Sequence, residues 1–333
     1  MWTDFYDKNS AEQRRNTDRT TKSVFLRCSA VCILCQLLQK FLHFQKEGNS
    51  LNIRSDIVRS ALVGEFLPSA IRKMSALEVG SFTIHVNTLP PAFDGLKIAH
   101  LSDLHNKKYG ENGCELFELI QKQKPDIVVM TGDMISHSAV NREDFIGLTK
   151  SLAEKYPTFY VNGNHEFSDM SDELFAKTAE QMKAAGAVCL DNAEYTIYKD
   201  GQKLNLCGVS YEAKFYRGVR EYKRNWEHFT LDEMERLCGK KPDGFTILLA
   251  HNPLDFAVYA EWGADVTFGG HIHGGSVRLP IVGGVFSPEL KPRPKYSEGI
   301  YRLGDKRMAV SRGLGRIRLF NPPELLVATL SVK

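Results

Sequence analysis

Five apolar runs in the chain are each followed directly by residue types that bind divalent metal ions. "LKIAHL" leads into "SDLH", "DIVVM" into "TGDM", "TFYV" into "NGNHE", "FTILLA" into "HNP" and "DVTF" into "GGHIHGG". The oxygen and imidazole donors in these blocks are Asp103, His105, Asp133, Asn164, His251, His271 and His273. Such a mixed set suits Mn, Fe, Co or Zn, whereas oxygen donors alone would suit Ca or Mg. The pattern therefore predicts a metal site.

The runs that precede these donors must be strands of a sheet if the donors are to meet. In open α/β sheets the carboxyl ends of the strands border one crevice, where ligands gather. Each donor alone has an ordinary alternative as a turn aspartate, a helix N-cap or a core histidine, but their joint occurrence after five β-type runs favours one pocket. If the last run continues as a strand, alternation turns His271 and His273 to the same side.

The rest of the chain supports an α/β class. From about Ala76, short β-type runs alternate with helical patterns, which is typical of an α/β sandwich. Further strands are expected at 204–209, 298–303, 308–311 and 325–330, and helices at 114–123, 171–186 and 231–238. A net charge of +3 is too small to indicate nucleic-acid binding, and seven cysteines without a spaced framework indicate reduced thiols.

The N-terminal part of the chain has a different texture. Residues 1–23 are polar, which predicts a disordered tail, and residues 24–75 predict an amphipathic or hydrophobic helical extension. The apolar core of 24–44 is about half of the ~20 residues that span a bilayer. A degenerate signal anchor, a helix lying on a membrane and a helix packed on protein all remain open. The protein is accordingly expected to be membrane-associated through this extension, or cytoplasmic.

The order of the metal-binding blocks resembles a known family. D-x-H, G-D, G-N-H-[DE], a lone H after a strand and G-H-x-H resemble the signature of calcineurin-like metallophosphoesterases. "LPPAFDGLKIAHLSDLH", "SRGLG" and "RLFNPPELLVATL" resemble its bacterial, often membrane-linked phosphodiesterase branch. The resemblance implies a four-layer α/β/β/α sandwich over residues 76–333 and two divalent metal ions, with Mn, Fe or Zn expected.

The resemblance also implies a role for each donor. The first ion would be held by Asp103, His105 and His273, and the second by Asn164, His251 and His271. Asp133 would bridge the two ions, and His165 in "GNHE" matches the family's catalytic histidine, which is not a ligand. His165, Asn164 and Asp133 are therefore the expected catalytic set. Glu166 is within the family pattern, which has Asp or Glu after the histidine.

The expected activity is hydrolysis of a phosphodiester or pyrophosphate bond by a hydroxide held between the two ions. The substrate would be a phosphorylated small molecule or a lipid-linked compound, such as UDP-2,3-diacylglucosamine, with a membrane surface as a possible partner and no nucleic acid. A phosphomonoesterase or protein phosphatase is the alternative. A non-catalytic binding scaffold of the same fold is a third reading, which loss of ligands would favour; none of the ligands is missing.

Two further segments could border the pocket. Tyr211 to Gly244 mixes aromatic and basic residues, and it could be a substrate lid or a solvated helical elaboration. The Gly- and Pro-rich loop after His273 carries four cations that could hold a second phosphate or simply be solvated: Arg278, Lys291, Arg293 and Lys295.

Overall fold

The computed structural model describes residues 76–136, 142–216, 226–275, 277–279, 283–286, 294–315 and 321–332. The predicted tail at 1–23 and the predicted extension at 24–75 lie outside these residues, as do Lys291 and Arg293. Within the described part of the chain, no helix is both long enough and apolar enough to cross a membrane.

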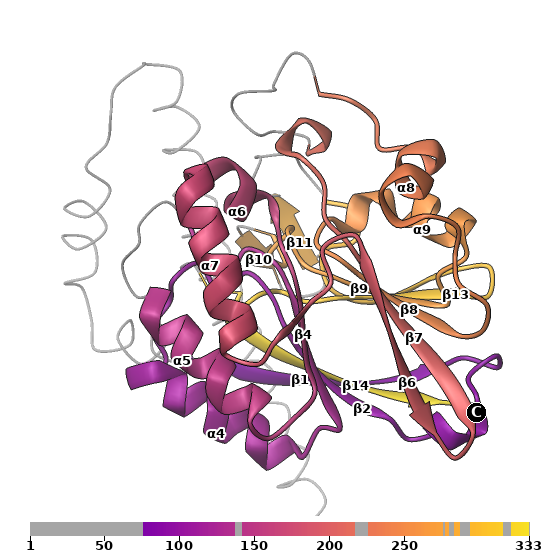
Figure 1. The fold of residues 1–333 in the computed structure, drawn as a ribbon, viewed down its shortest axis with the longest axis horizontal. Helices are drawn as coiled ribbons and strands as arrows, with labels where there is room; N and C mark the ends of the chain where they lie inside the picture. The colour runs from indigo at the N-terminus through magenta and orange to yellow at the C-terminus, as the bar shows by residue number, and fades with distance from the viewer. Residues whose placement is uncertain are drawn as a thin grey trace, which may run out of the picture. The chain divides into compact units, whose positions relative to one another are not determined.

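Two six-stranded sheets form the centre of the fold (Figure 1). In spatial order, the first sheet contains β1 (Glu78–His85), β14 (Glu324–Ser331), β2 (Lys97–Leu101), β3 (Ile127–Thr131), β4 (Thr158–Val161) and β5 (Val188–Cys189). The second contains β12 (Gly299–Leu303), β13 (Lys306–Val310), β9 (Val266–Gly269), β8 (Thr246–Ala250), β7 (Gln202–Val209) and β6 (Ala193–Lys199). A separate antiparallel hairpin pairs β10 (Val277–Leu279) with β11 (Gly283–Phe286).

The central strands of both sheets are parallel to their neighbours. β2 to β5 form one parallel block, and β7, β8, β9 and β13 form the other. Antiparallel pairs occur between β14 and β2, β6 and β7, and β12 and β13. Because all strands of a parallel block point the same way, their carboxyl ends lie at one edge of each sheet. The five metal-binding blocks follow β2, β3, β4, β8 and β9.

Alternation along the strands builds the layers. In β3, Ile127 and Val129 face the apolar core between the two sheets, while Val128 and Met130 face helices outside the first sheet. In β8, Leu249 faces the core between the sheets and Leu248 faces the helices of the other side. Both faces of these strands are covered, which explains why their sequences are continuous apolar runs.

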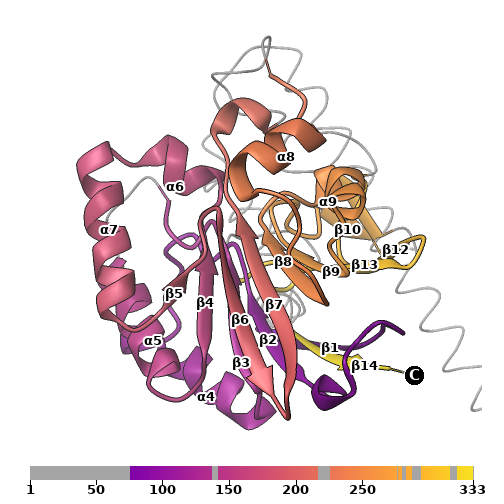
Figure 2. The ribbon, with the colours of Figure 1, turned by 45° about the vertical axis from the view of Figure 1, so that its right-hand side comes forward.

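The helices cover the two outer faces. Figure 2 shows one group outside the first sheet and the other beside the second. The first group is α4 (Cys114–Gln123), α5 (Arg142–Ala153) and α7 (Asp172–Ala184), and the second is α8 (Leu231–Cys238) and α9 (Phe256–Trp262). α6 (Asn164–Asp169) follows β4, and single 3-10 turns lie at η1 (Pro91–Phe93), η2 (Glu111–Gly113), η3 (Ala213–Phe215) and η5 (Pro253–Asp255). The predicted four-layer α/β/β/α architecture is confirmed.

Two of the helices have typical capping residues at their ends. The hydroxyl of Ser171 accepts a hydrogen bond from the N–H of Leu174 at the start of α7, and Thr230 accepts from Glu233 at the start of α8. Gly239, with φ of 73°, follows the last turn of α8. These caps satisfy backbone groups that have no partner inside the helix.

Candidate metal centre

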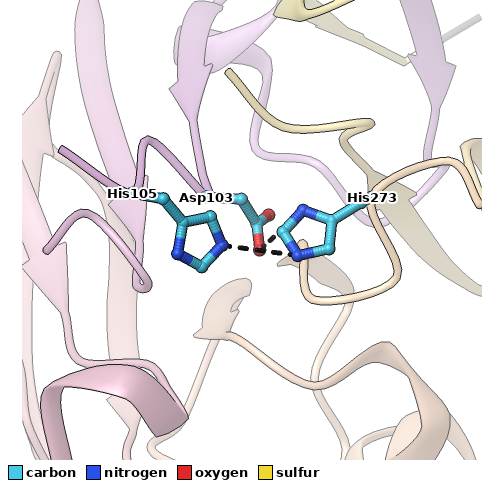
Figure 3. Close-up of side chains that lie close together, drawn as sticks. All are labelled: Asp103, His105 and His273. Carbon is cyan, nitrogen blue, oxygen red and sulfur yellow. Dashed lines mark hydrogen bonds and ion pairs between the residues drawn. The ribbon is translucent and has the colours of Figure 1, made fainter. Parts of the chain in front are cut away.

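Three donors from distant parts of the chain converge beyond the end of β2. Asp103 and His105 follow β2, and His273 follows β9 (Figure 3). Nε2 of His105 lies 3.4 Å from Nε2 of His273, and Nδ1 of His273 lies 3.5 Å from Oδ1 of Asp103. All three side chains are buried or nearly so. We call Asp103, His105 and His273 the first ligand group.

A second group forms around Asp133, which follows β3. His251 and His271 lie with it, and the donor atoms of the three residues are within 4.8 Å of one another. Nε2 of His251 is 3.1 Å from Oδ2 of Asp133. We call Asp133, His251 and His271 the second ligand group. The predicted ligand Asn164 directly precedes His165, whose N–H donates to Oδ1 of Asp133. Oδ2 of Asp133 lies 3.9 Å from Nε2 of His105, so Asp133 faces both groups.

His165 stands beside the two groups at the start of α6. Its Nε2 is 3.8 Å from Oδ2 of Asp133, and its N–H donates to Oδ1 of Asp133 at 2.8 Å. Its Nδ1 is hydrogen-bonded to Oδ2 of Asp169. Asp169 was not predicted from the sequence, although its position four residues after His165 on a helix was a signal that the two side chains could meet.

The backbone at the ligands is unusual. Five of the seven predicted ligands are in the left-handed region, with φ values of 53° for Asp103, 48° for His105, 52° for Asp133, 65° for His271 and 55° for His273. A residue other than glycine costs of order 1–3 kcal/mol in such a conformation, and these residues concentrate at functional sites. The surrounding structure must hold these turns in place.

This backbone corrects one expectation from the sequence. β9 ends at Gly269, so His271 and His273 lie on a turn and not on a continuing strand. Strand alternation was the wrong reason for their common direction: two left-handed residues on either side of the buried Ile272 place one imidazole in each group. The glycine before them is required by close approach, because a Cβ on Gly270 would lie 1.9 Å from Oγ of Ser102.

The charges at the centre depend strongly on one another. Burial alone would lower the pKa of His251, but the carboxylates of Asp133 and Asp103 raise it to about 9. Burial would raise the pKa of Asp133, yet the charges of His251 and His165 hold it well below its usual range. In the metal-free protein the His251 imidazolium therefore neutralises charge at a place where a metal ion would do the same.

Two residues that were not predicted to support the site fix the second group. The buried carboxylate of Glu166 accepts hydrogen bonds from the N–H groups of four residues, at 2.7 to 3.1 Å: Asp133, Met134, Ile135 and Gly163. The carbonyl oxygen of Thr131 is 2.6 Å from Nδ1 of His251. That contact requires a proton on Nδ1, which leaves Nε2 to face Asp133.

The donor spacing fits metal binding. Two donors that are each about 2.1 Å from one ion lie about 3.0–3.4 Å apart in octahedral or tetrahedral geometry. The 3.4 Å between His105 and His273 and the 3.1 Å between His251 and Asp133 match that range. Oδ1 of Asn164 is buried and has no hydrogen-bond partner among the described residues, as is expected of an oxygen reserved for an ion. The residues present therefore fit divalent ions.

Sequence comparison identifies the family. The sequence profile of calcineurin-like phosphoesterases matches residues 96–275, which include all seven predicted ligands and His165. The chain belongs to the calcineurin-like phosphoesterase family. Members of this family are metal-dependent phosphohydrolases, and the described His and Asp groups provide places for divalent ions. The family resemblance and the enzyme class predicted from the sequence are confirmed.

Similar proteins of this phosphoesterase family occur in bacteria. The metallophosphoesterase YkuE of Bacillus subtilis is 28% identical over 264 residues, which are 76% of this chain and 85% of YkuE. Phosphodiesterase YaeI of Escherichia coli is 28% identical over 244 residues, which are 70% of this chain and 82% of YaeI. Among solved structures, a dimetal phosphatase from Danio rerio is 12% identical and covers 66% of this chain and 88% of its own, with a TM-score of 0.38.

The structure describes only parts of the two segments that were expected to border the pocket, Tyr211 to Gly244 and the loop after His273. Tyr211, Phe215, Tyr216 and Phe229 are buried against α8 and α9, so this part of Tyr211 to Gly244 is a packed wall. The ring of Tyr216 lies 5.1 Å from that of His271, centroid to centroid. In the other segment, the guanidinium of Arg278 forms an ion pair with Glu298, and Nζ of Lys295 lies over the ring of Tyr296. Arg278 is thus engaged within the protein.

Proposed function

We propose that this phosphoesterase hydrolyses phosphodiester or pyrophosphate bonds with two divalent ions. The convergence of two ligand groups on Asp133, with His165 beside them, is the observation that carries the proposal. Asp103, His105 and His273 would hold one ion, Asn164, His251 and His271 the other, and Asp133 both. When bound, two such ions lower the pKa of a shared water and neutralise the phosphoryl oxygens. Mn, Fe and Zn suit this donor set.

The carboxylate of Asp133 supplies the charge that both positions need. Its Oδ2 lies within 3.9 Å of Nε2 atoms of three different imidazoles, those of His105, His165 and His251. Burial would raise the pKa of Asp133, but the charges of these three histidines outweigh that effect and hold the pKa low. The carboxylate therefore stays ionised at neutral pH. An ionised oxygen in the middle of the donor set is suited to bridging two cations.

His165 and Asp169 would handle the leaving group. The hydrogen bond between Nδ1 of His165 and Asp169 orients the ring so that Nε2 faces the centre. An imidazolium in this orientation can give its Nε2 proton to the departing oxygen while Asp169 holds the proton on Nδ1. Such help matters most for an alkoxide leaving group, which is a strong base.

A bridging phosphate bond is the substrate feature that we propose. Support comes from the similar protein YaeI, which is named a phosphodiesterase, and from a proton donor suited to a poor leaving group. Nucleotide-linked and lipid-like compounds, including UDP-2,3-diacylglucosamine, contain such a bond. Since Arg278 is paired with Glu298, the binding of a second phosphate is not assigned to Arg278.

A substrate panel with Mn added tests the proposal. We expect aryl and alkyl phosphodiesters and a dinucleoside pyrophosphate to be hydrolysed with higher kcat/KM than matched monoesters. His165→Ala should lower kcat about 10²–10⁴-fold for alkyl leaving groups and much less for p-nitrophenol, which leaves without a proton. His85→Ala, a change to an exposed histidine on β1, is the control. A preference for monoesters or phosphoproteins would contradict the substrate class, and equal losses for all leaving groups would contradict the donor role.

A further inference from the structure

The segment after β13 returns to the metal centre, where it contacts the loops that carry Asp103 and His273. We call residues 312–315 together with Asn321 the C-terminal clamp. It lies between β13 and β14, about 40 to 50 residues after His273 in the chain. Among the side chains of the clamp, only the amide oxygen of Asn321 is of a type that binds divalent ions. Its contacts with the ligand loops are made mostly by backbone groups and by the nitrogen of one amide.

The clamp holds the loop that carries Asp103. The N–H of Leu314 donates to the carbonyl oxygen of Ser102 at 2.9 Å, and the N–H of Gly315 donates to that of Asp103 at 2.6 Å. Asp103 has the left-handed backbone described above, so its peptide group needs external partners to remain in that orientation. These two hydrogen bonds provide such partners.

Asn321 holds the turn that carries His273. Its Nδ2 lies 2.6 Å from the carbonyl oxygen of His273 and 2.7 Å from that of Gly275. Because both partners are acceptors, the atom between them must be the donating nitrogen of the amide. Asn321 is only 1% exposed, so water cannot easily replace either bond if the donor is lost.

The clamp also leaves no room for a side chain at the centre of this turn. Gly274 has φ of 65°, and a Cβ there would lie 2.8 Å from Cγ of Arg312 and 2.9 Å from Nδ2 of Asn321. Arg312 is anchored in turn, since its guanidinium reaches Glu78 on β1 at 3.0 Å and Glu324 on β14 at 3.3 Å. The clamp is therefore joined to the first sheet by the ion pairs of Arg312, and it contacts the turn between His273 and Gly275.

The geometry points to Asn321 as a positioning residue for the first ligand group: we propose that its two hydrogen bonds set the affinity for the ion held by Asp103, His105 and His273. The inference rests on the proposed two-metal function. The second ligand group has other support, because Glu166 holds the backbone of Asp133 and Thr131 holds the ring of His251. Loss of the amide donor should therefore weaken the binding of the ion in the first ligand group and leave the binding of the other ion nearly unchanged.

Asn321→Asp in the full chain tests this. The aspartate has the same size but no side-chain N–H, and it places one carboxylate oxygen against the carbonyl oxygens of His273 and Gly275. We expect affinity for one of the two ions to fall about 10–100-fold, as for other groups that orient metal ligands. Titration of the metal-free protein with Co²⁺, followed by absorption spectroscopy, should show one tight and one weak step. Activity should recover when excess Mn restores occupancy, which would not happen if the change had simply damaged the fold.

Asn205→Asp is the matched control. Asn205 is also buried, and its Nδ2 also donates to a carbonyl oxygen, that of Asp243 at 3.0 Å, but it pairs with Thr246 at the start of β8, away from the centre. We expect this variant to bind both ions as the unchanged protein does. In a His105→Ala background, where the first position is already lost, adding Asn321→Asp should cause no further loss of affinity.

Each outcome decides between the two levels of the proposal. Failure of the unchanged protein to bind two ions would overturn the proposed function itself. Two unchanged binding steps in Asn321→Asp, or equal weakening of both steps, would overturn the role of Asn321 and leave the proposed function standing. If Asn321→Asp does not fold, Asn321→Ala replaces it, and failure of both variants to fold would show that Asn321 supports the domain and not one metal position.

Discussion

The two ligand groups of this phosphoesterase are supported in different ways. The second group is braced mainly from within the metal-binding blocks: Glu166, two residues after Asn164, binds the backbone of Asp133, and Thr131, two residues before Asp133, orients His251. In the first group, the N–H groups of Asp103 and His105 also donate to the carbonyl oxygens of Gly132 and Asp133 within a metal-binding block. This group is braced in addition by the C-terminal clamp, which lies outside every metal-binding block. Both positions are therefore supported by residues inside the family signature, and the first is supported by a late part of the chain as well.

This difference indicates how substitutions could change the affinity of one metal position with little effect on the other. A change in the clamp alters contacts to Asp103 and His273, while the carboxylate of Glu166 and its four N–H partners stay as they are. Interactions that share no partner are expected to act nearly additively. Asp133 is an exception, because it faces both groups. Asp103 is another, because it accepts a hydrogen bond from the N–H of His271 and its Oδ1 lies 3.9 Å from Nε2 of His251.

The largest expected effect follows from removing that shared residue. Asp133→Asn should lower the content of both ions and reduce kcat/KM by more than the about 10²–10³-fold that loss of a single electrostatic contact costs. His105→Ala should lower the content of only one ion. Metal analysis of the purified variants measures the difference, with Asp126→Asn, an exposed change just before β3, as the control. Full metal content in Asp133→Asn would break the comparison, since the two groups would then have no common member.

The next effect concerns the support of the second group. Glu166→Gln replaces one of two acceptor oxygens by an NH₂ group, so two of the four N–H donors lose their partner. We expect about 10–100-fold weaker binding of the ion held by His251 and His271, with the other ion less affected. Stepwise Co²⁺ titration beside Asn321→Asp measures this, and Glu173→Gln on the surface of α7 is the control. If both variants weakened the same ion, the two groups would not be independently supported.

A smaller effect is expected from pH. With a pKa of about 9, His251 is protonated at neutral pH in the metal-free protein, and an ion must displace that proton. We expect release of about one proton when the second position fills at pH 7.5, and tighter binding as the pH rises towards 9. Calorimetry in buffers of different ionisation heat measures the release. The metal-free protein should also lose the stability that this charge provides as the pH rises from about 6.5 to about 9. Binding that does not change with pH would contradict this account.

The smallest effect is expected from removing residues 1–75. Both ligand groups, the clamp and all described elements lie after Ala76, and β1 begins at Glu78. A chain of residues 76–333 should therefore keep its metal content and its kcat/KM within about two-fold. We further propose that residues 24–75 tether the protein to membranes, so only the full chain should sediment with anionic vesicles. Failure of the shorter chain to fold would mean that the extension belongs to the core.

The sequence by itself determined the central strands of both sheets and the residue types that follow their carboxyl ends. Strands were expected at 96–101, 126–130, 158–161, 204–209, 245–250 and 265–268, and β2, β3, β4, β7, β8 and β9 occupy them within one or two residues. Burial on both faces imposes a continuous apolar run, which is a local signal that can be read directly. β1 and β6 were not expected. Their residues are mostly exposed or half-buried, so their pattern is weak.

Only the tertiary structure decided how the donors are held. His105 and His273 are 168 residues apart in the sequence, and no local pattern states that their imidazoles lie side by side. The left-handed backbone of the ligands, the use of Glu166 as an acceptor for four N–H groups, the contact of Asp169 with His165 and the reach of Asn321 to His273 all depend on chain segments meeting after folding. Periodicity records which face of an element is buried, whereas a turn takes its shape from hydrogen bonds to distant parts of the chain.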